Sequence, residues 1–232
     1  MKIVSWNCQN GLTDIKANKI QEIFPDTDIF VIQECRRTDI YTFKENWKFK
    51  NWYGDDLEYS DLGIAVFSKE NNVEFTKAFN REFRYIVPYK VKIAQKSLTL
   101  LAVWTKPKPH YYDKNVTKAI QWYESKGLFV DDAIIIGDFN TGTSEKQQEY
   151  YSNLCKNLKG YKNCTLGKPE ELKETFCSKE NKLYLNDFCF VSESLYAYMK
   201  EIKIHDEWEE RLYGRSWRGL SDHCPIIVDF EL

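Results

Sequence analysis

The sequence contains no run of about 18 apolar residues, the length that a membrane-spanning helix needs. Its start, MKIVSWNCQNG, lacks the apolar core of a secretory signal and follows a strand-like pattern instead. Its seven cysteines contain no CxxC pair, so a zinc ribbon has no support, and their odd number favours reduced, mostly buried thiols. Together these absences predict a cytoplasmic protein that is not attached to a membrane.

An excess of one charge is also missing, because the formal net charge is only -2. A polyanion would therefore have to bind at a local patch, since no overall positive field attracts it. What the sequence does have is apolar and aromatic surface, with 43% hydrophobic and 16% aromatic residues. With no repeat, low-complexity tract or linker, this composition predicts one globular domain over residues 1–232.

Short apolar runs rich in Ile, Val and Phe predict strands, and three segments have apolar residues at helical spacing. The predicted strands are Lys2–Trp6, Asp28–Ile32, Leu62–Phe67, Tyr85–Ile93, Leu98–Val103, Ala133–Ile136, Phe188–Val191 and Pro225–Phe230. The predicted helices are Ile15–Phe24, Asn115–Lys126 and Ser144–Leu158. The last helix opens with a capping-box pattern. Many strands and few helices predict an α/β fold with a mixed sheet, or two packed sheets, and helices outside.

Polar side chains lie at the ends of these strands, and strand direction decides whether they meet. Such groups follow three strands and precede two others: Asn7, Glu34, Asp138 and Asn140 in the first case, Asp187, Asp222 and His223 in the second. If the last two strands run antiparallel to the first three, all of these groups lie on one rim. Carboxylates so close together repel one another unless a cation lies among them. An all-oxygen set favours magnesium, ahead of calcium or manganese, over zinc.

Two pairs within this set lead to more detailed predictions. Asp138 and Asn140 are two residues apart, so in extended backbone they can present a carboxylate and an amide to one water molecule. Asp222 and His223 are adjacent and would diverge in a regular strand, so they can serve one site only if the backbone bends there. Taken singly, each of these residues has a plain alternative as a solvated rim, turn or structural hydrogen-bonding residue.

Short motifs at these positions, in a fixed order, carry a family resemblance. They are Ser5-Trp6-Asn7, Ile32-Gln33-Glu34, Gly63-Ile64-Ala65-Val66-Phe67-Ser68, Gly137-Asp138-Phe139-Asn140, Asn186-Asp187-Phe188 and Ser221-Asp222-His223-Cys224-Pro225-Ile226. Spread over residues 3 to 230, the set resembles the endonuclease/exonuclease/phosphatase superfamily, which includes abasic-site endonucleases, deoxyribonuclease-like enzymes, deadenylases and inositol polyphosphate phosphatases. The resemblance implies a four-layer α/β/β/α sandwich of two mixed sheets, with the active site at one rim.

The resemblance also implies a role for each residue of the rim. Glu34 is expected to be the main metal ligand, assisted by Asn7 and Asp222, and the ion to be Mg²⁺ or else Mn²⁺. Asp138 and Asn140 are expected to align or deprotonate the attacking water. A metal ion neutralises the charge that develops on a phosphoester, while a fixed carboxylate presents water in line. These roles imply a phosphoester hydrolase, and we expect it to be a monomer with a nucleic acid as its substrate.

The phosphate contact is where this sequence departs from the family pattern. His223 is expected to contact the scissile phosphate and to be oriented by Asp187. Many members also have a His or Tyr at the end of the middle strand, where this sequence has Trp104, which is neither an acid nor a base. Thr105 and Lys106 are candidates for the missing phosphate contact. The departure bears on activity toward the usual substrates and leaves the metal ligands intact.

Basic and aromatic residues beside the motifs are the candidates for binding a substrate strand. Arg36 lies two residues after Glu34, and Arg215, Trp217 and Arg218 lie just before the Ser221 motif. Arginine binds phosphate in a bidentate manner, and tryptophan stacks on a base. The alternative for this group is an ordinary charged loop on the surface.

Three functions remain open from the sequence. A nuclease acting on DNA or RNA is favoured by the motifs around Asn7 and His223 and by the loop rich in Arg and Trp. A phosphatase or phosphodiesterase acting on a small molecule or an inositol phosphate fits the near-neutral charge, and predicts weak salt dependence of binding. A non-catalytic binding module that keeps the fold has only Trp104 in its favour, whereas the complete set of metal and water-positioning residues argues against it.

Overall fold

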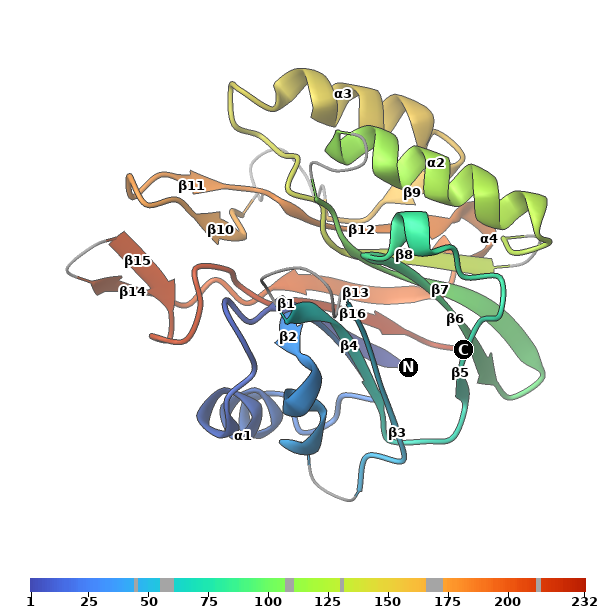
Figure 1. Ribbon diagram of the computed structural model, residues 1–232, viewed down its shortest axis with the longest axis horizontal. Coiled ribbons are helices and arrows are strands. Elements are labelled where there is room, and N and C mark those ends of the chain that lie inside the picture. The colour runs from blue at the N-terminus through green and yellow to red at the C-terminus, as the bar shows by residue number, and fades with distance from the viewer. Residues whose placement is uncertain (44–45, 55–60, 107–110, 130–131, 166–172, 212–213) are drawn as a thin grey trace.

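Two six-stranded sheets lie face to face in the computed structural model, which describes residues 1–43, 46–54, 61–106, 111–129, 132–165, 173–211 and 214–232 (Figure 1). The first sheet has the order β13 (Met199–Ile204), β16 (Ile226–Phe230), β1 (Lys2–Asn7), β2 (Ile29–Arg36), β4 (Leu62–Ser68) and β3 (Phe49–Gly54). The second has the order β5 (Val73–Phe75), β6 (Ile86–Ile93), β7 (Lys96–Trp104), β8 (Asp132–Asp138), β12 (Asp187–Ser192) and β9 (Tyr161–Asn163). Two short hairpins extend from the sheets: β10 (Phe176–Cys177) with β11 (Leu183–Tyr184), and β14 (Trp208–Arg211) with β15 (Gly214–Trp217).

The central strands are buried on both faces, which explains their nearly continuous apolar sequences. Side chains alternate along a strand, so each strand supplies two layers of the core. Val31 and Leu100 belong to the core between the sheets. Their neighbours Phe30 and Leu101 point outward into the core that packs against the helices. The two cores give the molecule its layered architecture.

Helices cover the outer faces of both sheets (Figure 1). The helix α1 (Asp14–Ile23) lies on the first sheet, while α2 (Tyr112–Ser125) and α3 (Gln148–Asn157) lie on the second. Single-turn elements complete the set: α4 (Glu193–Tyr196), η1 (Arg37–Tyr41) and η2 (Arg81–Phe83). This arrangement confirms the expected four-layer α/β/β/α sandwich. No helix of the described residues is long and apolar enough to cross a membrane.

The start of α3 differs from the sequence-based prediction. The helix begins at Gln148, not at Ser144. The capping-box pattern instead closes a turn, because the Gln147 amide donates to the Ser144 carbonyl at 2.9 Å and the Ser144 hydroxyl donates to the Gln147 side chain at 3.3 Å. Local side-chain hydrogen bonds of this kind satisfy a turn as readily as a helix start.

Strand direction brings the polar strand ends together, as the sequence predicted. The strand β1 runs parallel to β2, and β7 runs parallel to β8. In contrast, β12 runs antiparallel to β8, with Asp187 opposite Asp138, and β16 runs antiparallel to β1. The residues at the C-terminal ends of β1, β2 and β8 therefore meet those that precede β16 and begin β12, at one rim of the sandwich.

Candidate active site at the rim of the two sheets

Glu34 lies in a bulge near the end of β2. The pairing register with β4 shifts between Gln33 and Cys35, and Glu34 has a backbone φ of 57°. A left-handed backbone at a residue other than glycine costs about 1–3 kcal/mol and is retained mainly at functional sites. The bulge places the carboxylate so that it accepts hydrogen bonds from the Asn7 side-chain amide at 3.2 Å and from the Asn10 backbone amide at 2.9 Å.

Asp138, at the end of β8, is fixed by hydrogen bonds from two asparagines. It accepts from the Asn140 backbone amide at 2.8 Å, the Asn140 side chain at 2.9 Å and the Asn7 side chain at 2.9 Å. Gly137 permits this geometry, because its φ is 147° and a Cβ there would lie 1.9 Å from the Val103 carbonyl oxygen. Burial raises the pKa of Asp138 to about 7. A carboxyl with that pKa is suited to accept a proton near neutral pH.

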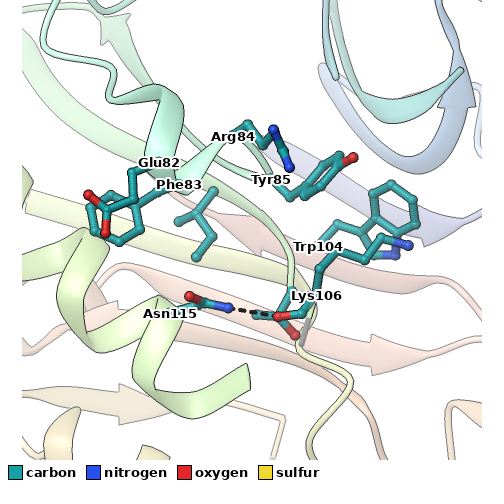
Figure 2. Close-up of a pocket in the computed structure, with 9 residues that line it drawn as sticks. Glu82, Phe83, Arg84, Tyr85, Trp104, Lys106 and Asn115 are labelled. Carbon is teal, nitrogen blue, oxygen red and sulfur yellow. Dashed lines mark hydrogen bonds between the residues drawn. The ribbon is translucent and has the colours of Figure 1, made fainter. Parts of the chain in front are cut away.

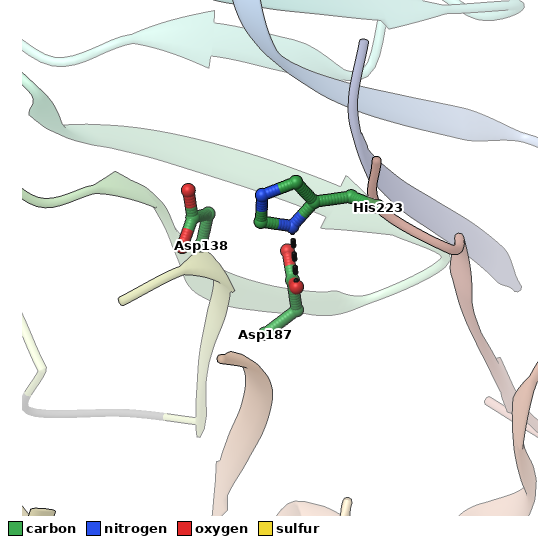
Figure 3. A group of neighbouring side chains, drawn as sticks. All are labelled: Asp138, Asp187 and His223. Carbon is green, nitrogen blue, oxygen red and sulfur yellow. Dashed lines mark hydrogen bonds and ion pairs between the residues drawn. The ribbon is translucent and has the colours of Figure 1, made fainter. Parts of the chain in front are cut away.

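His223 lies between Asp138 and Asp187, and ligand atoms of the three residues all lie within 4.8 Å of one another (Figure 3). Its Nδ1 is 2.8 Å from Asp187 Oδ2, and both side chains are buried. Burial by itself would lower the pKa of His223, but the carboxylates of Asp187 and Asp138 outweigh it and raise the pKa to about 10. His223 is therefore an imidazolium at neutral pH, which donates one N–H to Asp187 and keeps the other for a ligand.

The backbone bends at Asp222, which is how adjacent residues serve one site. Ser221 holds the bend, because its hydroxyl donates to the Asn7 carbonyl at 2.7 Å and accepts from the His223 backbone amide at 3.1 Å. Burial raises the pKa of the Asp222 carboxyl, and the negative charge of Glu34 raises it further. Two carboxylates that repel each other in this way offer a site for a cation between them.

The donor set at Glu34 and Asp222 fits a hard divalent cation, since it consists of oxygens. Asn7, the third expected ligand, forms hydrogen bonds through both ends of its amide. Its amide oxygen accepts from the Gln9 backbone amide at 3.0 Å, while its amide nitrogen bridges Glu34 and Asp138. In this arrangement Asn7 fixes the distance between the two carboxylates.

Lys16 is a contributor that the sequence did not reveal, because a lysine on α1 looks like an ordinary surface residue. Its ammonium donates to the backbone carbonyls of Cys8, Gln9 and Gly11, the last two at 2.7 and 3.3 Å. These bonds hold the loop whose Asn10 amide contacts Glu34. No spacing signal along the chain could have identified it, since its partners are carbonyls.

A model of the family described as the Endonuclease/Exonuclease/phosphatase family matches residues 4–223, which is nearly the whole chain. The protein belongs to this family. The family places the chain among the phosphoester hydrolases in general. The sequence matches no curated protein.

Solved structures of other members have the same fold. An AP endonuclease from Archaeoglobus fulgidus matches with a TM-score of 0.70, 18% identity and full coverage of both chains (100% each). The 3' phosphatase NExo from Neisseria, bound to a product DNA hairpin, matches with a TM-score of 0.68, 17% identity and 100% coverage of each chain. The endonuclease domain of TRAS1, a telomere-specific non-LTR retrotransposon, matches with a TM-score of 0.67 and 15% identity over 100% of this chain and 98% of that one. At such identities the likeness shows the shared fold alone.

Trp104, which the family resemblance puts at or beside a position expected to hold His or Tyr, is a core residue. It belongs to the core between the sheets, is 1% exposed and packs edge-on against Tyr85 with 5.0 Å between ring centroids. Lys106 Nζ lies 3.3 Å from the centre of the Trp104 ring (Figure 2). The adjoining cavity measures only about 10 Å³. Thr105 is also buried, and its hydroxyl donates to the Phe139 carbonyl, so this hydroxyl supports the strand end next to Asn140.

In the loop rich in Arg and Trp, the structure contradicts the expectation that Trp217 stacks on a base. Trp217 is fully buried, packs edge-on against Trp6 at 5.1 Å between centroids and donates to His205 at 3.3 Å, so neither face of its ring is free to stack on a base. The arginines stay on the surface in ion pairs. These pairs are Arg36 with Asp61 at 3.4 Å, Arg215 with Glu210 at 2.8 Å, and Arg218 with Glu207.

Proposed function

We propose that the protein is a magnesium-dependent nuclease that cleaves phosphodiester bonds of DNA or RNA with water, and that it acts as one catalytic domain. The observation that carries the proposal is the pairing of Asp138 with His223. A buried carboxyl whose pKa is near 7 lies beside an imidazolium whose pKa is near 10. Two titratable groups whose pKa values are pushed apart in this way can accept a proton from water and donate a hydrogen bond to phosphate at the same pH.

Glu34 and Asp222 are the residues that would hold the ion, with Asn7 fixing Glu34. When bound there, Mg²⁺ would neutralise charge on the phosphate and on the departing oxygen. Asp138, Asp187 and His223 form a second group with metal-ligating atoms. The hydrogen bonds of this second group favour Glu34 and Asp222 as the ion site. His223 Nδ1 is already bound to Asp187, and both Asp138 oxygens accept from asparagines.

The protein's own residues account for the activation of water. As the water oxygen bonds to phosphorus, Asp138 accepts the proton that water loses, the bond from phosphorus to the leaving oxygen breaks, and the leaving oxygen takes its proton from solvent. Asn140 holds Asp138 in place through both of its amide groups. His223, fixed by Asp187, donates its remaining N–H to a non-bridging phosphate oxygen. Positioning and electrostatic stabilisation of this kind supply most of the rate enhancement in phosphoryl transfer.

A phosphatase or phosphodiesterase acting on a small phosphoester is a second candidate. The ion pairs of Arg36, Arg215 and Arg218 favour it, because arginines held by carboxylates contribute less to binding a long polyanion. The similar structures include an AP endonuclease and a 3' phosphatase, and the latter is bound to a product DNA hairpin. The two candidates differ in the size of their substrate, which is a polymer for the nuclease and a small molecule for the second candidate.

The test is a cleavage panel with single-stranded DNA, duplex DNA, abasic-site duplex, RNA and inositol phosphates, each with Mg²⁺, Mn²⁺ or EDTA. Glu34→Ala, Asp138→Asn and His223→Ala are the site variants, and Asp132→Asn, at the other end of β8, is the control. Metal-dependent cleavage of a nucleic acid that only the control retains would support the nuclease. Phosphate release from inositol phosphates alone would replace it with the second candidate. A wild-type protein that cleaves nothing would refute both candidates.

A further inference from the structure

A groove of about 370 Å³ lies on the outer face of the second sheet, away from the rim. It is formed where β5 and β6 meet the C-terminal end of α2. This end of α2 lies on the right in Figure 1, and the hairpins β10–β11 and β14–β15 lie on the left. Four lysines line it: Lys77, Lys90, Lys92 and Lys126. Among the described residues that line the groove, Glu74 is the single carboxylate, so the local charge is +3 in a chain whose total is -2.

The alternation of β6 explains why lysines gather there. Val87, Tyr89 and Val91 belong to the core between the sheets, which leaves Lys90 and Lys92 on the outer face. Both lysines are exposed. Neighbouring side chains on one face of a strand are about 6.6 Å apart, and phosphates on one strand of a duplex repeat every 3.4 Å or so. Because the 3.4 Å repeat is measured along the helix axis, the separation between Lys90 and Lys92 suits contacts to nearby phosphates of one strand.

Fewer carboxylates accompany these ammonium groups than accompany the arginines at the rim. Within the described ranges, no ion pair involves Lys77, Lys90, Lys92 or Lys126, although Glu74 lies opposite Lys90 where β5 pairs with β6 and Lys126 lies 4.5 Å from the centre of the Trp122 ring. Lysines without acidic partners release counterions when they bind phosphates, which is the main source of sequence-independent affinity for nucleic acid. The charge here is thus available to a polyanion, whereas the charge of the rim arginines is largely offset.

We propose that this groove binds backbone phosphates of a nucleic-acid substrate at a distance from the scissile bond, which rests on the proposed nuclease function. The strand β7 connects the two places, since Ser97 lines the groove and Trp104 pairs with Asp138. Seven residues of strand span roughly 23 Å, which is about seven base pairs of duplex. Substrates shorter than this cannot contact the groove while their scissile phosphate lies at the rim, whereas longer ones are long enough to do so.

The test compares a 30-base-pair duplex with a hairpin of six base pairs, both fluorescently labelled, by anisotropy in EDTA. The groove variant is Lys90→Gln/Lys92→Gln/Lys126→Gln. The matched control, Lys156→Gln/Lys159→Gln/Lys203→Gln, removes the same charge from exposed positions outside the groove. The groove variant should bind the long duplex about tenfold more weakly, with a salt slope that is smaller by about 2–3. Its loss of affinity for the short hairpin, which cannot span the groove and the rim together, should be smaller, and the affinities of the control should match those of the wild type.

Equal affinity of the groove variant and the wild type for the long duplex would overturn the groove proposal. So would an equal loss in the control variant, which would reduce the effect to overall charge. Cleavage of the short hairpin in Mg²⁺ distinguishes failure of the groove proposal from failure of the proposed nuclease function. A wild type that cleaves the hairpin while the groove variant binds normally refutes the groove alone. A wild type that cleaves neither substrate but binds the long one through the groove refutes the nuclease alone.

Discussion

The hydrogen bond between Asp187 and His223 permits the sharpest prediction about the site. Asp187→Asn keeps the shape of the side chain and removes the negative charge next to His223 Nδ1, 2.8 Å away. A hydrogen bond to a charged partner contributes about 1.5–3 kcal/mol, and each 1.4 kcal/mol or so corresponds to a tenfold change in rate. The substitution should therefore lower kcat by roughly 10- to 150-fold, provided that this bond is as important in the transition state as in the free enzyme.

The pKa of His223 gives a second readout that a purely structural role would not move. Asp187 and Asp138 raise this pKa from 6.5 to about 10, so Asp187→Asn should lower it, and the alkaline limb of the rate profile should move to lower pH. Because the folded pKa lies above the unfolded one, His223 contributes stability that is complete below about pH 6.5 and is lost as the pH rises through about 10. In the variant, that loss should begin at lower pH.

Imidazole NMR can measure the shift directly, since the chain has only three histidines. His205, whose pKa is lowered by burial, serves as an internal reference, and His223→Ala assigns the signal. Rates from pH 6 to 10 or so and urea unfolding complete the assay, with Asp132→Asn as the control. An unchanged His223 pKa together with an unchanged rate profile in Asp187→Asn would refute the assigned coupling.

Two further predictions follow from side chains that support the rim. Trp104→Ala should lower the free energy of unfolding by about 3–5 kcal/mol, because it leaves a cavity between the sheets. Trp104→His should also destabilise the fold and should not raise the rate of catalysis. Urea denaturation measures the stability of both variants, and an activity assay measures their rates. Equal stability of wild type and Trp104→His would contradict the core assignment. Lys16→Met should raise the Mg²⁺ concentration needed for half-maximal activity, because the loop that carries the Asn10 amide loosens, whereas Lys19→Met, on the same helix, should leave it unchanged.

The sequence predicted the elements that carry the site but not several edge elements. Strands buried on both faces, such as β2 and β8, have apolar runs that need no context. In contrast, β3 and β13 mix apolar with charged residues, because each lies at the edge of its sheet and is only partly buried. Their identity as strands comes from pairing with a neighbour, which no local pattern encodes.

The sequence by itself determined which polar residues stand at strand ends, because burial on both faces forces polar side chains off the strand and onto its ends. Only the tertiary structure decided what each of these residues contacts. Asn7 donates to Asp138, which is 131 residues away, and Ser221 donates to the carbonyl of Asn7 across 214 residues. Trp217, which looked suited to stack on a base, is instead enclosed by Trp6 and His205. Burial and pKa depend on neighbours that the fold brings together from distant segments, and residue spacing along the chain contains no such information.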